Sequence, residues 1–196
     1  LIRRKSIYWV LMANMWGRYS TSQETALEED LNIIKNSNDN IWASMLGKVR
    51  DRSGRLQLNS NDLLGAGTNS RFFTIFYIML KNRGAIDWFN GLKIDEGSSV
   101  SLSTHVHHIF PKAYLKKHGF SEDNQIHLAT INEMANLALI TGKTNVQISD
   151  KAPSEYFKPI NEAYPDALEK QLIPDNPEFW KIESFEEFLN IRRRLI

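Results

Sequence analysis

Two pieces of sequence between His105 and Lys151 decide the fold: His105-Val-His107-His108-Ile-Phe-Pro111 and Asn136-Leu-Ala-Leu-Ile-Thr-Gly-Lys-Thr-Asn145. The first predicts a short strand that ends before Pro111, because proline lacks the N–H that a central strand needs. The second begins with a short apolar run, which is typical of a buried strand. Thr141 then predicts a helix N-cap, and this puts Asn145 in the first or second turn of a helix. The predicted order is strand, long loop, strand and helix.

The order of these residues resembles the pattern of the HNH (His-Me finger) nucleases. That pattern is an Asp or His followed by His, two residues and Pro, then an Asn, then a distal Asn or His. The matching positions in this sequence are His107, His108, Pro111, Asn136 and Asn145. The resemblance implies a ββα-metal motif and hydrolysis of phosphodiester bonds.

A narrower resemblance covers nearly the whole chain. Residues 107–115, 135–145 and 148–156 resemble the C-terminal half of GmrSD-type proteins, and residues 18–31 and 83–89 are similar to it as well. The resemblance implies the nuclease of modification-dependent restriction and related phage-defence systems, acting on DNA. It also implies an upstream N-terminal NTPase-like domain that senses DNA modification. The sequence does not begin with Met, and we expect it to be a fragment of a longer protein.

The resemblance assigns a role to each of four residues. His108 is implied as the general base, and a histidine with a pKa of about 6.5 can take a proton from water at neutral pH. His107 and Asn145 are implied as ligands of a divalent metal ion, which stabilises charge on the phosphate and assists the leaving group. Asn136 is implied as a brace that ties the loop carrying His108 to the second strand.

The implied metal ligands are an imidazole and an amide, without a carboxylate. Magnesium is a hard ion that prefers oxygen ligands, so we expect weak Mg²⁺ binding in the absence of DNA phosphates. We expect Mg²⁺ or Mn²⁺ to be the ion in use, and we leave Ni²⁺ and Zn²⁺ open. The chain has no cysteine, which excludes disulfides and thiolate metal sites.

Basic residues around the two pieces are predicted to bind substrate. Lys112, Lys143 and Lys151 flank the pieces and could neutralise DNA phosphates, and His105 lies on the same strand face as His107. For each of them, a solvated surface side chain is the alternative. The formal net charge of +1 argues against a protein that coats DNA, but it allows a local basic patch.

Each of these residues also has a plain structural explanation. A histidine pair before a proline is common in turns with solvated imidazoles, and His127, in the long loop, is expected to be structural or exposed. The segment Gly65-Ala-Gly67 is a loop with too few glycines to predict a phosphate cradle. An inactive finger that only binds DNA or a partner therefore stays open. A nuclease acting on RNA also stays open, because no residue in the sequence indicates whether the 2′-hydroxyl, which distinguishes RNA from DNA, is recognised.

We expect a mainly α protein with the ββα-metal motif embedded in it. Its predicted parts are a helical lobe over residues 1–98, the finger over 99–152 and C-terminal helices over 153–196. Residues 70–81 are apolar nearly all round and predict a central buried helix. Arg192-Arg-Arg194 closes the last predicted helix, where the helix dipole explains a cluster of arginines and contact with phosphate is the alternative. No run is long enough to span a membrane and no signal peptide is visible, so a cytoplasmic location is expected.

Overall fold

The computed structural model describes residues 2–36, 40–94 and 104–196. The chain divides into two compact units, Leu1–Leu58 and Asn59–Ile196. The structure is 62% helix, which confirms the predicted mainly α class. The second unit contains residues of all three predicted parts, 1–98, 99–152 and 153–196. The division into these three parts stays a prediction. The expected boundary between residues 98 and 99 lies outside the described residues.

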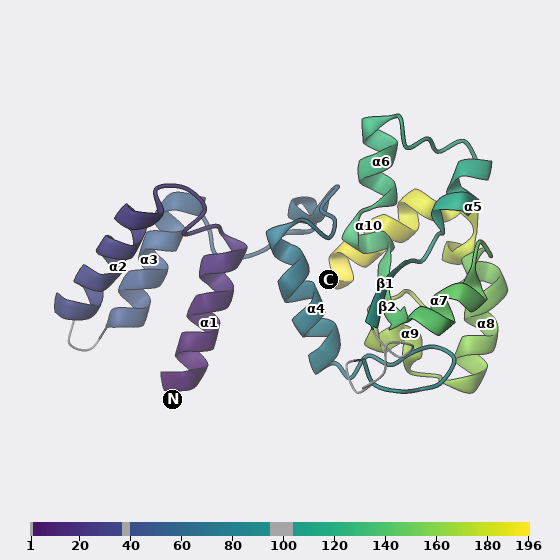
Figure 1. The fold of residues 1–196 in the computed structure, drawn as a ribbon, viewed down its shortest axis with the longest axis horizontal. Helices are drawn as coiled ribbons and strands as arrows, with labels where there is room; N and C mark the ends of the chain where they lie inside the picture. The colour runs from purple at the N-terminus through teal and green to yellow at the C-terminus, as the bar shows by residue number, and fades with distance from the viewer. Residues whose placement is uncertain (1, 37–39, 95–103) are drawn as a thin grey trace. The chain divides into compact units, whose positions relative to one another are not determined.

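The first unit consists of helices packed around a small apolar core (Figure 1). They are α1 (Ile2–Met15), α2 (Gln23–Asn36) and α3 (Ile41–Ser53). Helix α3 packs against both of the others. The core residues are Trp9, Ala13, Met45 and Val49. A buried ion pair ties the turn after α1 to α2, since Nη2 of Arg18 lies 2.9 Å from Oδ1 of Asp30.

The second unit encloses a small antiparallel sheet, with helices on several sides of it (Figure 1). Its strands are β1 (Thr104–His108) and β2 (Leu137–Thr141), and their register pairs His108 with Leu137. The α-helices are α4 (Arg71–Asn82), α5 (Lys112–Lys117), α6 (Gln125–Ile131), α7 (Gly142–Ile148), α8 (Pro153–Ala163), α9 (Ala167–Lys170) and α10 (Phe185–Leu195). Short 3-10 helices are η1 (Ser60–Leu63), η3 (Met134–Asn136), η4 (Pro177–Trp180) and η5 (Ile182–Ser184). None of the described helices is both long and apolar enough to cross a membrane.

Both predicted strands form, and the predicted helix cap is confirmed. β2 is buried along its whole length, as its apolar run requires. β1 ends at His108, before Pro111. Oγ1 of Thr141 accepts a hydrogen bond from the backbone N–H of Thr144 at 3.3 Å, which caps α7 and places Asn145 near its start.

The long loop predicted between the strands contains two helices, α5 and α6. Asn124 caps α6, because its Oδ1 accepts a hydrogen bond from the N–H of Ile126 at 2.9 Å. His127 therefore lies on a helix and not in a loop, with its ring 5.2 Å from that of Phe120. The prediction missed α6 because a helix of seven residues is too short to show a clear apolar period.

The helix predicted over residues 70–81 forms as α4, but it is not the centre of the core. Of its residues, Phe76 and Leu80 are buried, and most of its other apolar side chains are half-buried. The centre is formed instead by aromatic residues from other segments, which are Trp88, Phe110, Tyr156, Phe157, Trp180, Phe185 and Phe188. An apolar composition all round leaves a helix without a preferred face, so the sequence cannot show which side finds partners.

Arg192 and Arg193, at the end of α10, have specific partners in addition to any interaction with the helix dipole. Arg192 is wholly buried, and its guanidinium donates to backbone carbonyls that include those of Ala135 at 2.9 Å and Gln171 at 3.1 Å. Burial lowers the pKa of Arg192 to about 9. Nη1 of Arg193 lies 2.5 Å from Oε1 of Glu133, which is buried. These contacts fix the segment just before β2 to the C-terminal helix.

Candidate active site

The sheet and α7 bring the predicted metal residues together. His107 and His108 are neighbours on β1 and face opposite ways, as successive strand residues do. His107 is 3% exposed, whereas His108 is half-buried. Asn145, on α7, places its Oδ1 2.7 Å from Nδ1 of His107. The imidazole and the amide that the sequence paired are therefore in direct contact.

His107 is held in an aromatic environment. Its ring meets Trp88 edge-on with centroids 5.8 Å apart, and its Nε2 is buried with no hydrogen-bond partner among the described residues. Burial lowers the pKa of His107 to about 4, although the hydrogen bond with Asn145 acts in the opposite direction. The imidazole is consequently neutral at neutral pH, which is the form that binds metal ions.

The donor atoms at this point fit a divalent metal ion. Because an amide oxygen only accepts hydrogen bonds, Nδ1 of His107 donates to Oδ1 of Asn145 at 2.7 Å in the metal-free protein. When the imidazole proton instead lies on Nε2, Nδ1 and Oδ1 both offer lone pairs that can face one ion. An ion held by these two groups would take its other ligands from water and phosphate oxygens. Within the described parts of the chain, no three His, Cys, Asp or Glu side chains gather to hold a metal by themselves.

The carboxylates of Glu133 and Asp150 both already have partners. Glu133 is 1% exposed; besides its ion pair with Arg193, its Oε2 accepts a hydrogen bond from the N–H of Gly65 at 3.0 Å. Oδ2 of Asp150 accepts from Nζ of Lys117 at 2.6 Å, and this hydrogen bond lowers the pKa of the carboxyl. Neither carboxylate replaces the amide as the partner of the imidazole.

The two histidines and Asn145 open onto a cleft of about 520 Å³, named here the metal-side cleft. Its other lining residues are Val106, Pro111, Lys112, Ala113, Val146, Ser149 and Asp150. Both predicted metal ligands and the predicted general base therefore contribute to the lining of one cleft, although the two histidine side chains lie on opposite faces of β1. Of the four predicted substrate-binding residues, Lys112 belongs to this lining.

His108 has a partner that the sequence did not suggest. Its Nε2 lies 3.0 Å from Oδ1 of Asn132, a half-buried residue 24 positions further along the chain. Because an amide oxygen only accepts hydrogen bonds, Nε2 is the protonated nitrogen and Nδ1 keeps its lone pair. Burial lowers the pKa of His108. No spacing rule identifies Asn132, since the contact depends on how the segment after α6 folds back.

Asn136 lies where a brace for the His108 segment was predicted. It is fully buried, its Oδ1 accepts from the N–H of Phe110 at 2.8 Å, and its Nδ2 donates to the carbonyl of Phe110 at 3.1 Å. Nδ2 also donates to the carbonyl of Ile131 at 2.9 Å. The amide thus fixes the chain two residues after His108, and its part in catalysis stays a prediction.

Asp87 is a second residue that the sequence analysis did not single out. It is fully buried; its Oδ2 accepts from the N–H of Thr141 at 2.6 Å and its Oδ1 from Oγ1 of Thr144 at 2.7 Å. These bonds hold the first turn of α7, and with it Asn145. The sequence did contain a signal for Asp87, because it lies within residues 83–89, one of the segments that carried the family resemblance.

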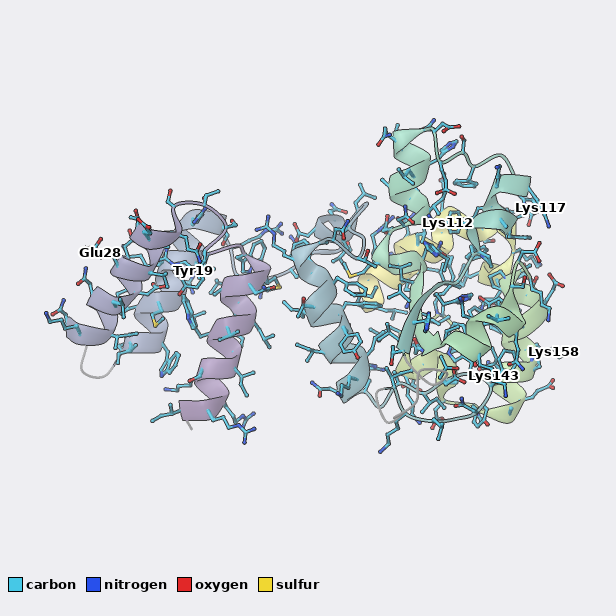
Figure 2. All side chains as sticks on the ribbon, in the orientation of Figure 1. Tyr19, Glu28, Lys112, Lys117, Lys143 and Lys158 are labelled. Atoms are coloured by element: carbon cyan, nitrogen blue, oxygen red, sulfur yellow. The ribbon has the colours of Figure 1, made fainter. Side chains whose placement is uncertain are left out.

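The predicted substrate-binding residues do not form one basic cluster. Nζ of Lys112 lies 3.1 Å from Oε2 of Glu122, and Nζ of Lys151 donates to the carbonyl of Gln147 at 3.2 Å. Lys143 is exposed on α7, and Figure 2 shows it well apart from Lys112 in the same unit. His105 is exposed on β1, with its ring over Gly142. Their roles toward substrate stay predictions.

A histidine–amide pair on a small sheet in a helical protein does not by itself define a class of protein. Comparison with known proteins places the chain in a nuclease family. The chain belongs to the family described as the C-terminal domain of GmrSD restriction endonucleases, whose model matches residues 50–188. The match includes nearly all of the second unit and residues 50–58 of the first. Family membership thus confirms the resemblance to the C-terminal half of GmrSD-type proteins.

A more distant relative is the uncharacterized protein MJ0686 of Methanocaldococcus jannaschii. It is 28% identical over 160 residues, which are 79% of this chain and 25% of that protein. The chain therefore spans about a quarter of the length of this curated relative. No solved structure matches the chain.

Proposed function

We propose that the chain is a metal-dependent HNH (His-Me finger) endonuclease or nickase that hydrolyses DNA phosphodiester bonds. In this proposal β1, β2 and α7 are the ββα-metal motif. The observation that carries it is the meeting of Nδ1 of His107 and Oδ1 of Asn145, 2.7 Å apart, in the cleft that also contains His108. Membership in a restriction endonuclease family supports the same reaction class.

His108 acts as the general base in the proposed reaction. Its Nε2–H donates to Asn132, so Nδ1 is the atom that takes a proton from the attacking water. The lowered pKa keeps this nitrogen unprotonated at neutral pH. Asn136 acts through position, because it holds the backbone of Phe110 and so keeps the end of β1 in place.

His107 and Asn145 would hold the divalent ion, Mg²⁺ or Mn²⁺ in use, with Ni²⁺ and Zn²⁺ also able to bind. When bound, such an ion stabilises negative charge on the phosphate and assists the leaving oxygen. With two protein ligands and no free carboxylate in the set, affinity in the absence of DNA is expected to be weak. Mn²⁺, Ni²⁺ and Zn²⁺ should bind more tightly than Mg²⁺.

The proposal extends to the surroundings of the site. Lys112, Lys143, Lys151 and His105 contact DNA phosphates, each as one of several weak electrostatic contacts. The domain is the effector half of a cytoplasmic modification-dependent restriction or phage-defence protein. An upstream NTPase-like domain senses the modification and controls cleavage.

The test is plasmid nicking with a panel of divalent metals, on the wild-type protein and on His108→Ala. General bases contribute about 10²–10⁴-fold, so the variant should lose at least about 100-fold in rate. Its circular dichroism spectrum and DNA affinity should match the wild type. His118→Ala is the matched control, because His118 is an exposed histidine at the end of α5 outside the metal-side cleft.

Three results would contradict the proposal. A His108→Ala variant that keeps more than about a tenth of the wild-type rate removes His108 as the base. A wild-type protein that binds DNA but cuts it with none of the metals is a binding module. Cleavage of RNA of the same sequence, with DNA left intact, changes the substrate class.

A further inference from the structure

A second cleft, of about 530 Å³, meets the metal-side cleft at His108 and is named here the base-side cleft. Its lining comes from the loop before α4, from β1, from α6 and from the segment that leads to β2. The lining residues are Gly65, Gly67, Thr68, Asn69, Val106, His108, Gln125, Leu128, Ala129, Asn132 and Leu137. Val106 and His108 line both clefts, so the predicted general base lies at the border between them.

The chemistry of the base-side cleft differs from that of the metal-side cleft. Apart from His108, none of its described lining residues is ionisable, whereas Lys112 and Asp150 line the metal-side cleft. A phosphate here would find no cation. The lining offers amide and hydroxyl groups beside apolar surface, the combination that small organic ligands require, and the volume lies within the usual range of about 300–1,000 Å³.

Two amides in this lining are available to a ligand. Asn69 and Gln125 are exposed, and the structure gives neither side chain a hydrogen bond with another described residue. Asparagine and glutamine amides pair with the donor and acceptor edges of nucleobases. The apolar side chain of Leu128 lies in the same lining and offers surface to the face of a ring.

The wall of the base-side cleft is preformed. The carbonyl of Ala66 accepts a hydrogen bond from the N–H of Met134 at 2.7 Å, and the N–H of Gly65 donates to buried Glu133 at 3.0 Å. Gly67 packs so closely that a Cβ there would lie 2.7 Å from the carbonyl oxygen of Asn132. The loop that carries Asn69 is therefore attached to the segment that positions His108.

We propose that the base-side cleft is a subsite for one nucleobase of the DNA strand, adjoining the phosphate that His108 serves. Asn69 and Gln125 hydrogen-bond the edge of the base, and Val106 and Leu128 contact its face. The inference rests on the proposed function and adds to it a preference for the identity of the base beside the cut.

The first experiment measures binding without cleavage. Fluorescence anisotropy in a chelator compares 12-mers of deoxyadenylate, deoxycytidylate and thymidylate with an abasic 12-mer of equal charge. At least one base-bearing strand should bind about fivefold or more tightly than the abasic strand, since stacking and pairing of even one base has that effect. Ala129→Trp fills the cleft and should remove the difference, while affinity for the abasic strand stays unchanged. Ile126→Trp, on the same helix but 76% exposed and outside the cleft, is the control and should behave as the wild type.

The second experiment maps the ends of DNA cut by the wild-type protein. The bases beside the cut should be unevenly distributed, and Asn69→Ala and Gln125→Ala should each make the distribution more even. Gln147→Ala removes an exposed amide on α7, outside both clefts, and should leave it unchanged.

The two experiments separate the subsite from the nuclease activity. Equal affinity for base-bearing and abasic strands, or an identical cut distribution in wild type, Asn69→Ala and Gln125→Ala, overturns the subsite while cutting itself stands. Preferential binding of base-bearing strands that is lost in Ala129→Trp supports the subsite even if no metal elicits cleavage, in which case only the proposed function falls.

Discussion

His107 is a titratable side chain almost without solvent contact, so its charge state is coupled to folding. Its pKa is about 4 in the folded protein and about 6.5 in an unfolded chain. Between these values the unfolded state binds more protons than the folded state. The stability from the neutral folded form is therefore fully present above about pH 6.5 and is lost as the pH falls towards 4.

For the metal-free protein in a chelator, we expect His107 to lower the free energy of unfolding by about 3 kcal/mol between pH 7 and pH 4. The measurement is denaturant unfolding across this range, followed by tryptophan fluorescence, because Trp88 contacts His107. Subtracting the curve of His107→Gln removes the contribution of the carboxylates. Parallel pH dependences of the two proteins would contradict the burial argument.

Asn132 is expected to orient His108 by accepting its Nε2–H. Asn132→Leu removes the acceptor and should lower kcat about 10–100-fold, with little change in KM or metal affinity. Asn132→Asp supplies another acceptor and should keep the rate within about tenfold of wild type. The two variants are compared in the plasmid assay and in Mn²⁺ calorimetry. Equal losses in both, or a matching loss of metal affinity, would return Asn132 to a purely structural role.

Asn136 and Asn145 lie on either side of β2, and their substitution by alanine should have different effects on stability and metal binding. Asn136→Ala leaves buried groups of Phe110 and Ile131 unpaired, at about 1–3 kcal/mol for each, so a loss of stability of about 3 kcal/mol or more is expected. Its folded fraction should keep metal affinity. Asn145→Ala leaves one group of the buried His107 imidazole unpaired, so it should cost less stability, about 1–3 kcal/mol, but weaken metal binding and cleavage together.

The comparison needs three measurements on each asparagine variant: unfolding free energy, Mn²⁺ affinity and cleavage rate. The stability measurement matters because a loss of activity in Asn136→Ala can follow from unfolding alone. Equal loss of metal affinity in the two variants would show that their roles are assigned wrongly.

Local signals in the sequence were enough to predict the strand that carries His107 and the helix that carries Asn145. Pro111 ended β1 and Thr141 capped α7, because each acts through its own backbone or its nearest neighbours. The contacts that complete the site are not local. Asn132 reaches His108 across 24 positions and Arg192 reaches Ala135 across 57, and no periodicity encodes such pairs. The same limit explains the wrong prediction that α4 is the central helix, because its apolar residues were recognised from the sequence but their packing partners were not.

For the whole molecule, the division into units has a consequence for the site. Among the described residues, the core of the second unit contains none from the first, and the metal-side and base-side clefts are lined only from within Asn59–Ile196. A compact unit with its own apolar core is expected to fold by itself. The first unit has a separate core around Trp9 and Met45.

We therefore expect the fragment 59–196 to fold, to melt cooperatively and to bind Mn²⁺ within about twofold of the full chain, because it keeps the whole core and both ligands. A shorter fragment, 68–196, is the control. It lacks Leu63, which is 1% exposed, and the bonds that Gly65 and Ala66 make to Glu133 and Met134. Burying a leucine is worth about 1.5–3 kcal/mol, so this control should melt at a clearly lower temperature. Circular dichroism melting and Mn²⁺ calorimetry on both fragments make the comparison. If the longer fragment lacks a cooperative transition, or loses its metal affinity while folded, then the first unit is needed to form the site, and the separation of the two cores does not describe how the protein folds.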